Sequence, residues 1–135
     1  MSFVIDCSIL LTWVLPDEAT EATRGLYAEL TANGAHAPIL LRYEITNALI
    51  NAERRRRISA AFRSGALRDI SQLPIHYDVP THPMAMDSLV ELAARHRLTV
   101  YDASYLALAL DRGIPLATFD KEIIAAARSL SVPLF

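Results

Sequence analysis

The sequence predicts an α/β fold, in which a mainly parallel sheet is covered by helices on both faces. Short apolar runs alternate along the chain with longer segments of helical spacing, which is typical of βαβ units. The chain has 135 residues, of which 53% are hydrophobic, so it can bury the core of one domain over residues 1–135.

The chain begins with a strand and two helices. Residues 3–5 form a short apolar run and predict a buried strand, which ends at Asp6. Ser8 is a suitable N-cap for a helix over residues 8–14, and Pro16 closes that helix. Residues 17–32 predict a second helix, because one face of this segment carries the apolar residues Ala19, Ala22, Leu26 and Leu30.

The middle of the chain repeats this alternation. Asn33-Gly34 ends the second helix, and residues 35–38 predict a second strand. Residues 40–57 predict a long helix with the apolar stripe Leu41, Ile45, Ala48 and Ala52. Another helix is expected over residues 59–72, with Ser59 as its N-cap, and residues 74–79 predict a third strand.

The last third of the chain contains three predicted helices and two predicted strands. Thr81 is a suitable cap for a helix over residues 83–96, whose inner face is formed by Met86, Leu89, Val90 and Ala93. A helix over residues 101–112 stops at Gly113. Residues 115–119 predict a fourth strand that ends in Asp120. The last elements are a helix over residues 121–130 and a terminal strand over residues 132–135.

Composition and charge exclude several classes of protein. Thirteen basic and fifteen acidic residues give a net charge of −2, so the chain does not coat nucleic acid by bulk positive charge. A single cysteine excludes a disulfide framework. The sequence contains no glycine-rich phosphate loop, which argues against an NTPase. The sequence shows no export signal and no apolar run of membrane-spanning length. We therefore expect a soluble cytoplasmic protein with no membrane partner.

Four acidic residues occupy positions typical of a site at one edge of a parallel sheet. Asp6 and Asp120 directly follow predicted strands. Glu44 lies in the first turns of the helix after the second strand, and Asp102 opens another helix. Ligands of open parallel sheets bind at the carboxyl ends of the strands, where the strand order reverses. If the first and fourth strands flank that point, all four acids reach the same edge.

Each acid also has a purely structural interpretation. Asp102 and Asp120 are suitable helix N-caps, and Asp6 can cap the helix that follows it. Glu44 can be a solvated helix residue. If the four carboxylates converge, their mutual repulsion raises their pKa values unless a cation neutralises them. A hard divalent ion such as Mg²⁺ or Mn²⁺ suits an all-oxygen site of this kind and can activate water for phosphodiester cleavage.

The segments around these acids resemble one protein family in their order and spacing. They are VIDCS at residues 4–8, YEITNAL at 43–49, YDASYLALA at 101–109 and LATFD at 116–120. Together they resemble the PIN-domain ribonucleases, and within that family the VapC-type (virulence-associated protein C) toxins of type II toxin–antitoxin systems.

This resemblance implies a fold, an activity and a set of partners. The fold is a three-layer sandwich with a central parallel five-stranded sheet. The activity is that of an endoribonuclease dependent on Mg²⁺ or Mn²⁺, whose catalytic residues and metal ligands are Asp6, Glu44, Asp102 and Asp120. The partners are RNA (tRNA and ribosomal RNA are candidates), a cognate antitoxin protein and a second copy of the chain in a homodimer.

Three polar residues near the acids have two interpretations each. Asn47 follows Glu44 by one helical turn, so it either holds Glu44 or a phosphate or lies on the solvated face of the helix. Ser8 and Thr118 lie within two residues of an acid. Their hydroxyls either support a ligand carboxylate or a metal-bound water, or serve local capping.

Two further features indicate a partner-binding surface. Arg54, Arg55, Arg56 and Arg57 close the long helix. Cations at a helix C-terminus are favourable, but four exceed what capping requires, so we expect contacts with RNA phosphates or with acidic residues of an antitoxin. Trp13 belongs to a strongly apolar first helix. It is either a core residue or an anchor for a dimer or antitoxin interface.

Two alternatives to the nuclease remain. The first is a catalytically inactive PIN-like module that acts by binding RNA or protein. The second is a phosphatase or receiver domain with Asp6 as phosphoacceptor. Ser8 stands where a phosphatase of the haloacid-dehalogenase type needs a second Asp, and the single lysine, Lys121, does not match the late lysine of a receiver.

Overall fold

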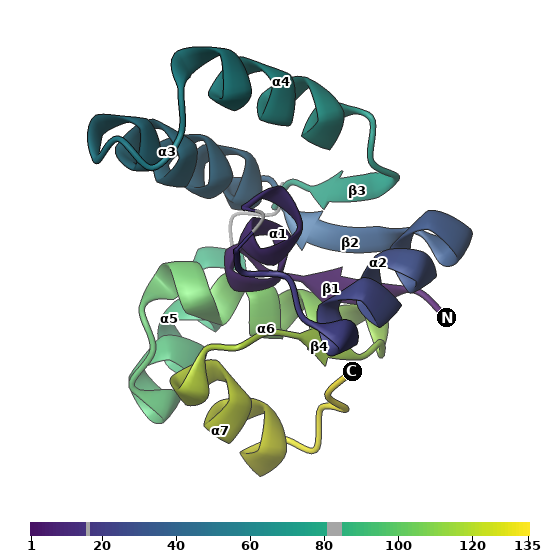
Figure 1. The fold of residues 1–135 in the computed structure, drawn as a ribbon. Coiled ribbons are helices and arrows are strands. Elements are labelled where there is room, and N and C mark those ends of the chain that lie inside the picture. The colour runs from purple at the N-terminus through teal and green to yellow at the C-terminus, as the bar shows by residue number, and fades with distance from the viewer. Residues whose placement is uncertain (16, 81–84) are drawn as a thin grey trace.

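The computed structural model describes residues 1–15, 17–80 and 85–135. At its centre is a parallel sheet with the strand order β3-β2-β1-β4 (Figure 1). Its strands are β1 (Phe3–Ile5), β2 (Ala35–Pro38), β3 (Ile75–Asp78) and β4 (Leu116–Ala117). The predicted α/β fold is confirmed. The predicted roles of Pro16 and Thr81, and the predicted helix start at residue 83, lie outside the described residues.

The fifth strand of the prediction is wrong, since the sheet in the described residues has four strands. The segment over residues 132–135 forms one parallel bridge instead, between Leu116 and Leu134. The Leu116 N–H donates to the carbonyl of Pro133 at 2.9 Å, and the Phe135 N–H donates to the Leu116 carbonyl at 3.1 Å. Because Pro133 has no N–H and β4 is only two residues long, the pairing does not extend into a strand.

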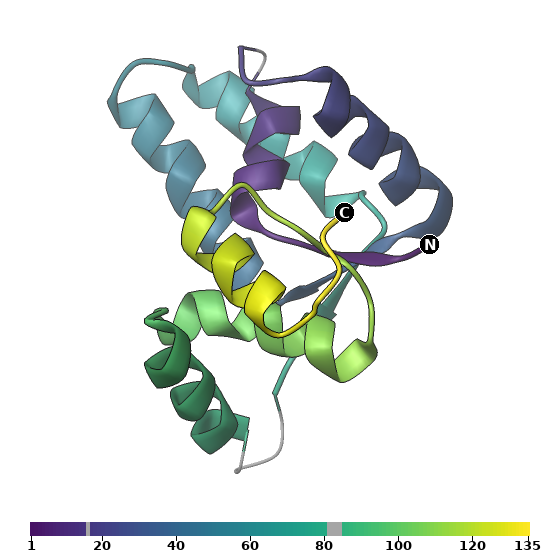
Figure 2. The ribbon, with the colours of Figure 1, turned by 90° about the horizontal axis from the view of Figure 1, so that it is seen from below.

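Helices form a layer on each side of the sheet, as Figure 2 shows. On one side lie α1 (Cys7–Val14), α2 (Glu21–Asn33), α3 (Leu40–Arg54) and α4 (Ala60–Ser71). There α1 packs against α2 and α3, and α4 packs against α3. On the other side α6 (Val100–Arg112) lies against β1, β2 and β4. The helices α5 (Ala85–His96) and α7 (Lys121–Ser129) pack against α6.

The predicted ends of three helices need correction. Ser8 does not cap α1, which begins at Cys7 with Asp6 as its N-cap. The helix α2 begins at Glu21 and not at residue 17, because Thr20 and Thr23 form a capping box there. The helix α3 ends at Arg54 and not at residue 57. Arg56 adopts a left-handed conformation with φ 60°, and the Arg57 N–H donates back to the Ala52 carbonyl at 2.9 Å.

The predicted inner face of α5 is half right. Leu89 and Ala93 are buried, whereas Met86 and Val90 are 47% and 58% exposed. The helix packs against α6 along the row that contains Leu89 and Ala93, so the adjacent row formed by Met86 and Val90 faces away. The predicted fourth strand over residues 115–119 is too long, since β4 covers only Leu116–Ala117. Three predicted helix boundaries are confirmed. Ser59 caps α4, and Gly34 and Gly113 end their helices with φ of 75° and 62°.

None of the helices in residues 1–15, 17–80 and 85–135 is both long enough and apolar enough to cross a membrane.

Candidate active site

The strand order reverses between β1 and β4, which is the condition under which the four acids reach the same edge. From β1 the chain adds β2 and β3 on one side and then returns to place β4 on the other. Asp6 directly follows β1, and Asp120 lies three residues after β4. Glu44 and Asp102 lie in the first turns of α3 and α6. All four acids therefore belong to segments that start at the carboxyl edge of the sheet (Figure 1).

The Asp6 carboxylate is buried and accepts three hydrogen bonds. Its Oδ1 accepts from the Ser8 hydroxyl at 2.6 Å and from the Ile9 N–H at 3.2 Å. Its Oδ2 accepts from the Thr118 hydroxyl. Asp6 is thus the N-cap of α1, which was its structural interpretation, and at the same time it contacts the segment that follows β4.

The hydroxyls of Ser8 and Thr118 extend this network to the backbone. The Phe119 N–H donates to Ser8 Oγ at 2.9 Å, and the Asp120 N–H donates to Thr118 Oγ1 at 3.0 Å. Each hydroxyl therefore donates to Asp6 and accepts from the loop before α7. Side chains, and not a longer strand ladder, join the ends of β1 and β4 at this edge.

Glu44 is held by a residue that the sequence reasoning missed. The Tyr105 hydroxyl donates to Glu44 Oε1 from α6, on the other side of the sheet, and Tyr105 is 1% exposed. One signal was available, since Tyr105 follows Asp102 by three residues and so shares its face of α6. Asn47 is exposed, and in the described residues no hydrogen bond joins its side chain to Glu44.

The other two acids differ in what they contact. Asp120 Oδ1 accepts from the backbone N–H groups of Glu122 and Ile123 at 2.9 and 3.0 Å, so Asp120 caps α7. Asp102 is not the cap of α6. Thr99 has that role, because its hydroxyl accepts from the Asp102 N–H at 3.0 Å. The capping interpretation therefore holds for Asp120 and fails for Asp102.

Electrostatic coupling shows which acids lie near one another. Burial raises the pKa of Asp6, although its hydrogen bonds act in the opposite direction. Burial also raises the pKa of Glu44, and the charges of Asp102 and Asp6 raise it further. For Asp102 the pKa is raised by burial, then by Asp120 and Glu122. The four predicted acids are therefore linked by repulsion, and Glu122 joins them.

The thiol beside Asp6 is not a nucleophile in this setting. Burial, together with the charges of Glu44 and Asp6, raises the pKa of Cys7 to about 12. A thiol with such a pKa is protonated at neutral pH, and only a thiolate is strongly nucleophilic.

The donor set suits a hard divalent cation. It consists of carboxylate oxygens, and the charges of neighbouring acids raise the pKa values of Glu44 and Asp102, a repulsion that a cation would relieve. In the described residues, however, no three His, Cys, Asp or Glu side chains are grouped tightly enough to hold an ion between them. The chemistry of the donors fits a metal, and its binding would have to draw the carboxylates closer together.

The PIN domain family matches residues 3–129 of the sequence. The chain belongs to the PIN-domain family. Ribonuclease VapC3 of Pyrobaculum aerophilum is 28% identical over 133 residues, which are 98% of this chain and 100% of that relative. Ribonuclease VapC1 of Mycobacterium tuberculosis is 37% identical over 103 residues, which are 76% of this chain and 73% of that relative. The resemblance to VapC-type PIN-domain proteins is thereby confirmed.

A solved structure supports the same assignment. The crystal structure of PAE2754 from Pyrobaculum aerophilum matches this PIN domain with a TM-score of 0.70 at 26% sequence identity. The match covers 93% of this chain and 84% of that one. The similarity therefore includes the sheet and both helical layers, and not an isolated supersecondary unit.

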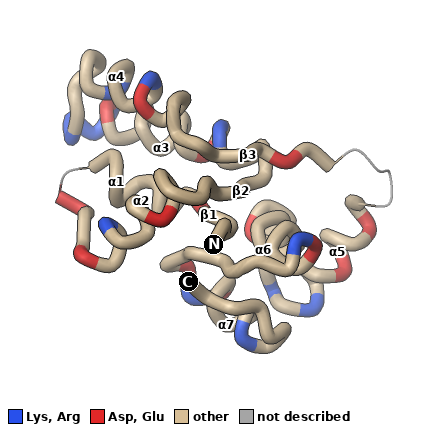
Figure 3. The backbone as a smooth tube through the Cα atoms, turned by 90° about the vertical axis from the view of Figure 1, so that its right-hand side faces the viewer, with Lys and Arg blue, Asp and Glu red and all other residues tan. Residues whose placement is uncertain are grey.

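The arginine run of this PIN domain divides into two parts. Residues 54–56 are exposed at the turn between α3 and α4. Arg57 instead points back to the segment between α1 and α2, where its guanidinium lies 3.2 Å from Asp17 and 3.3 Å from Glu18. Figure 3 shows basic positions at the end of the molecule formed by α3 and α4. Residues 54–56 are therefore better placed than Arg57 for contact with a partner.

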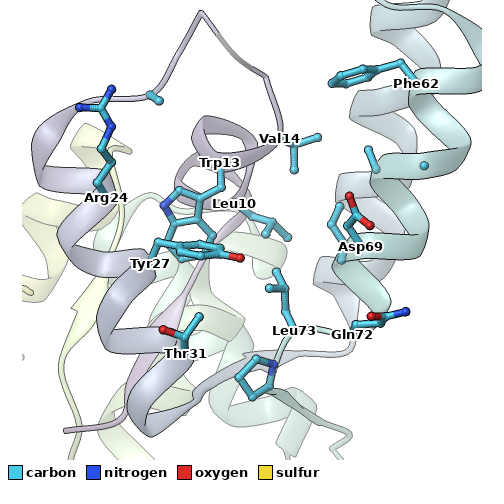
Figure 4. A pocket seen from close by; sticks show the side chains of 15 residues that line it. Leu10, Trp13, Val14, Arg24, Tyr27, Thr31, Phe62, Asp69, Gln72 and Leu73 are labelled. Atoms are coloured by element: carbon cyan, nitrogen blue, oxygen red, sulfur yellow. The ribbon is translucent and has the colours of Figure 1, made fainter.

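An apolar groove of about 880 Å³ separates α1 and α2 from α4 (Figure 4). Trp13 lines it from α1, and its indole N–H donates to the Thr23 carbonyl at 2.6 Å. The Tyr27 ring stands edge-on to Trp13, with centroids 5.3 Å apart, and Phe62 faces them from α4. Trp13 thus packs partly against the core and partly lines an open apolar surface.

Proposed function

We propose that this PIN domain is an endoribonuclease dependent on Mg²⁺ or Mn²⁺, and that it is the toxin of a toxin–antitoxin pair in the cytoplasm. The observation that carries the proposal is the set of four acids at the strand-order reversal, where the charges of neighbouring acids add to burial in raising the pKa values of Glu44 and Asp102. Two curated relatives bear the name ribonuclease VapC, which supports RNA as the substrate and an antitoxin as a partner.

The four acids are the proposed metal ligands, and hydroxyl groups orient two of them. Asp6, Glu44, Asp102 and Asp120 would hold the ion or ions. A bound divalent ion supplies an activated water and stabilises the charge that develops at the scissile phosphate. Ser8 and Thr118 orient the Asp6 carboxylate, and Tyr105 orients that of Glu44.

Proton transfer is assigned to the same carboxylates. Water attacks phosphorus, the bond from phosphorus to the leaving oxygen breaks, and the proton lost by the water passes to a carboxylate. One of the four carboxylates is proposed as the general base that accepts this proton. The proton is then available for the leaving oxygen.

Two surfaces away from the acids are assigned to contacts with the partners. We assign the apolar groove beside Trp13 to the antitoxin, because it combines aromatic side chains with a volume of about 880 Å³. Residues 54–56 are assigned to RNA phosphates or to acidic residues of the antitoxin. A homodimer, and tRNA or ribosomal RNA as substrate, complete the proposal.

Cleavage of RNA by the purified chain tests this function directly. Total tRNA and ribosomal RNA are incubated with Mg²⁺ or Mn²⁺, and in parallel with EDTA. Asp6→Asn and Asp120→Asn are expected to abolish cleavage with the fold intact, as checked by circular dichroism. Asp87→Asn is the matched control, because Asp87 is an exposed acid on α5, outside the proposed site, and it should cleave like the wild type.

Two outcomes would contradict the proposal. Cleavage by Asp6→Asn or Asp120→Asn at the wild-type rate would show that the acids are wrongly assigned. RNA binding without any metal-dependent cleavage by the wild-type chain would favour the inactive interaction module.

A further inference from the structure

Two histidines lie side by side on neighbouring strands, on a part of the sheet that the proposed active site does not use. His36 in β2 and His76 in β3 are partners in the parallel register, so their side chains leave the same face of the sheet. Their ring centroids are 5.3 Å apart, and the ring planes are inclined by 65°. The two imidazoles therefore form a close pair across the strands labelled β2 and β3 in Figure 1.

The charged groups around this pair offset one another. Asp78 follows His76 by two residues in β3, so it shares the face of the two histidines. Arg112, in the last turn of α6, donates to Asp78 Oδ1 at 3.2 Å. Arg42 belongs to the opposite face of the sheet, where its guanidinium lies over the Tyr77 ring. Because the Arg112 guanidinium is paired, a cation beside the two imidazoles does not meet an uncompensated positive charge.

The His36 ring is uncharged at neutral pH and incompletely satisfied. Burial lowers the pKa of His36, and the charges of Arg112 and His76 lower it further. Asp78 acts on it in the opposite direction. A neutral imidazole has one nitrogen with a free lone pair, and in this form histidine is a metal ligand. His36 Nδ1 is buried and has no hydrogen-bond partner among the residues that the structure describes, whereas buried polar atoms of native proteins usually have one.

The separation of the two rings fits a shared metal ion. In a tetrahedral zinc site each Zn–N bond is about 2.0–2.1 Å long, and the centre of the imidazole lies about 1 Å behind its nitrogen. Two imidazoles on one such ion therefore have their centroids about 5 Å apart. The separation of 5.3 Å between the His36 and His76 centroids agrees with this value. Because His76 is exposed, its ring can turn a nitrogen toward the ion without disturbing the core.

We propose that His36 and His76 bind Zn²⁺ on the α6 side of the sheet, with water completing the coordination. Imidazole nitrogen suits Zn²⁺, whereas the carboxylates of the proposed active site suit Mg²⁺ or Mn²⁺. In the part of the chain that the structure describes, no third His, Cys, Asp or Glu is grouped with these two, so the ion binds reversibly and less tightly than in a closed structural site. The ion ties β3, an outer strand of four residues, to β2. The proposal does not depend on the proposed nuclease function.

Calorimetric titration of Zn²⁺ into the full chain tests the proposal. A large excess of Mg²⁺ is present throughout, because Mg²⁺ occupies oxygen sites and competes poorly for imidazole. His76→Ala and His36→Gln should each weaken Zn²⁺ binding at least about tenfold, since even the loss of a residue that only supports a metal ligand commonly costs about 10- to 100-fold. Circular dichroism checks that both variants keep the fold, which the exposed position of His76 and the polar side chain of Gln at position 36 favour.

His96→Ala is the matched control. His96 Nε2 is also buried and has no hydrogen-bond partner among the described residues, but His96 belongs to none of the close ring pairs found there. This variant should bind Zn²⁺ like the wild type. Two further measurements locate the ion. Zn²⁺ should shift the ring-nitrogen NMR signals of His36 and His76 and leave those of His96 in place, and it should raise the Tm of the wild type more than that of His76→Ala.

Three results would overturn the proposal. Absence of Zn²⁺ binding by the wild type in excess Mg²⁺ would exclude the site. Equal Kd values for the wild type, His76→Ala and His36→Gln would place the ion on other residues. A rise in the sedimentation coefficient on addition of Zn²⁺ would show that the ion joins two copies of the chain, contrary to a site within one chain. Since RNA cleavage is not measured here, failure of the nuclease proposal would leave these results unaffected.

Discussion

Removal of one buried hydroxyl should reveal how strongly the site acid Glu44 is held. In Tyr105→Phe the ring stays in place, but Glu44 Oε1 loses the donor that reaches it from α6. A hydrogen bond to a charged group contributes about 1.5–3 kcal/mol, and the half-buried position of Glu44 favours the lower part, about 1.5–2 kcal/mol. For 135 residues this corresponds to a decrease in Tm of roughly 5–10 °C at pH 7.

The pH dependence identifies the partner of this hydrogen bond. The bond from Tyr105 lowers the pKa of Glu44, so its contribution to stability is largest when Glu44 is ionised and decreases as pH falls. The Tm difference between Tyr105→Phe and the wild type should therefore be larger at pH 7 than at pH 4. Glu44→Gln should reduce the effect of Tyr105→Phe, which a double-mutant cycle measures.

Tyr27→Phe is the matched control for this measurement, because Tyr27 is 41% exposed in α2 and should melt like the wild type. The argument is refuted if Tyr105→Phe melts at the same temperature as Tyr27→Phe. A Tm loss that is equal at pH 4 and pH 7 would show that the lost partner is not an ionising carboxylate.

Three further predictions concern the acids, the arginines and the groove. Burial raises the pKa of Asp6, so ionisation of Asp6 destabilises the metal-free fold as the pH rises above the ordinary pKa of 3.8. The Tm of Asp6→Asn should therefore increase relative to that of the wild type from pH 4 to pH 7. Mg²⁺ should raise the Tm of the wild type and not that of Asp6→Asn. A Tm difference between Asp6→Asn and the wild type that stays the same from pH 4 to pH 7 would contradict this. Arg55→Ala should reduce the salt dependence of RNA binding by about one unit in the log–log slope, and Arg57→Ala should reduce it less because Arg57 already pairs with two acids. Equal slopes for both variants would count against the division of the run. Phe62→Ala should weaken binding of the purified cognate antitoxin at least about fivefold without changing RNA cleavage, and unchanged affinity would remove the antitoxin from this groove.

The sequence was most informative where chain order and local chemistry coincide. An apolar run followed by an acid indicated both β1 with Asp6 and β4 with Asp120, although β4 is only two residues long; that these strands are neighbours comes from the structure. Helix starts are harder to predict than strand ends, because the apolar spacing continues beyond the cap and does not mark the first residue of the helix. Thr20 and Thr23 decide the start of α2 through their mutual hydrogen bonds, although the apolar pattern begins earlier.

Contacts between distant segments were beyond the sequence pattern. Tyr105 and Glu44 are 61 positions apart, and neither residue type indicates that the other is its hydrogen-bond partner. The prediction of a terminal strand was wrong for a related reason. Apolar residues after α7 suggest a strand, but Pro133 limits the pairing with β4 to one bridge. The exposed face of Val90 depends on the rotation of α5 against α6, which periodicity alone does not determine.

The bond between Asp6 and Thr118 has a consequence for the synthesis of the chain. The two residues are 112 positions apart, so Asp6 leaves the ribosome roughly 6–20 s before its partner at common rates of translation. Until β4 and the loop before α7 have been made, Asp6 lacks the hydroxyl of Thr118, and Asp120 has not been added to the chain. On the proposed function, a nascent chain that still lacks this segment has an incomplete set of site acids.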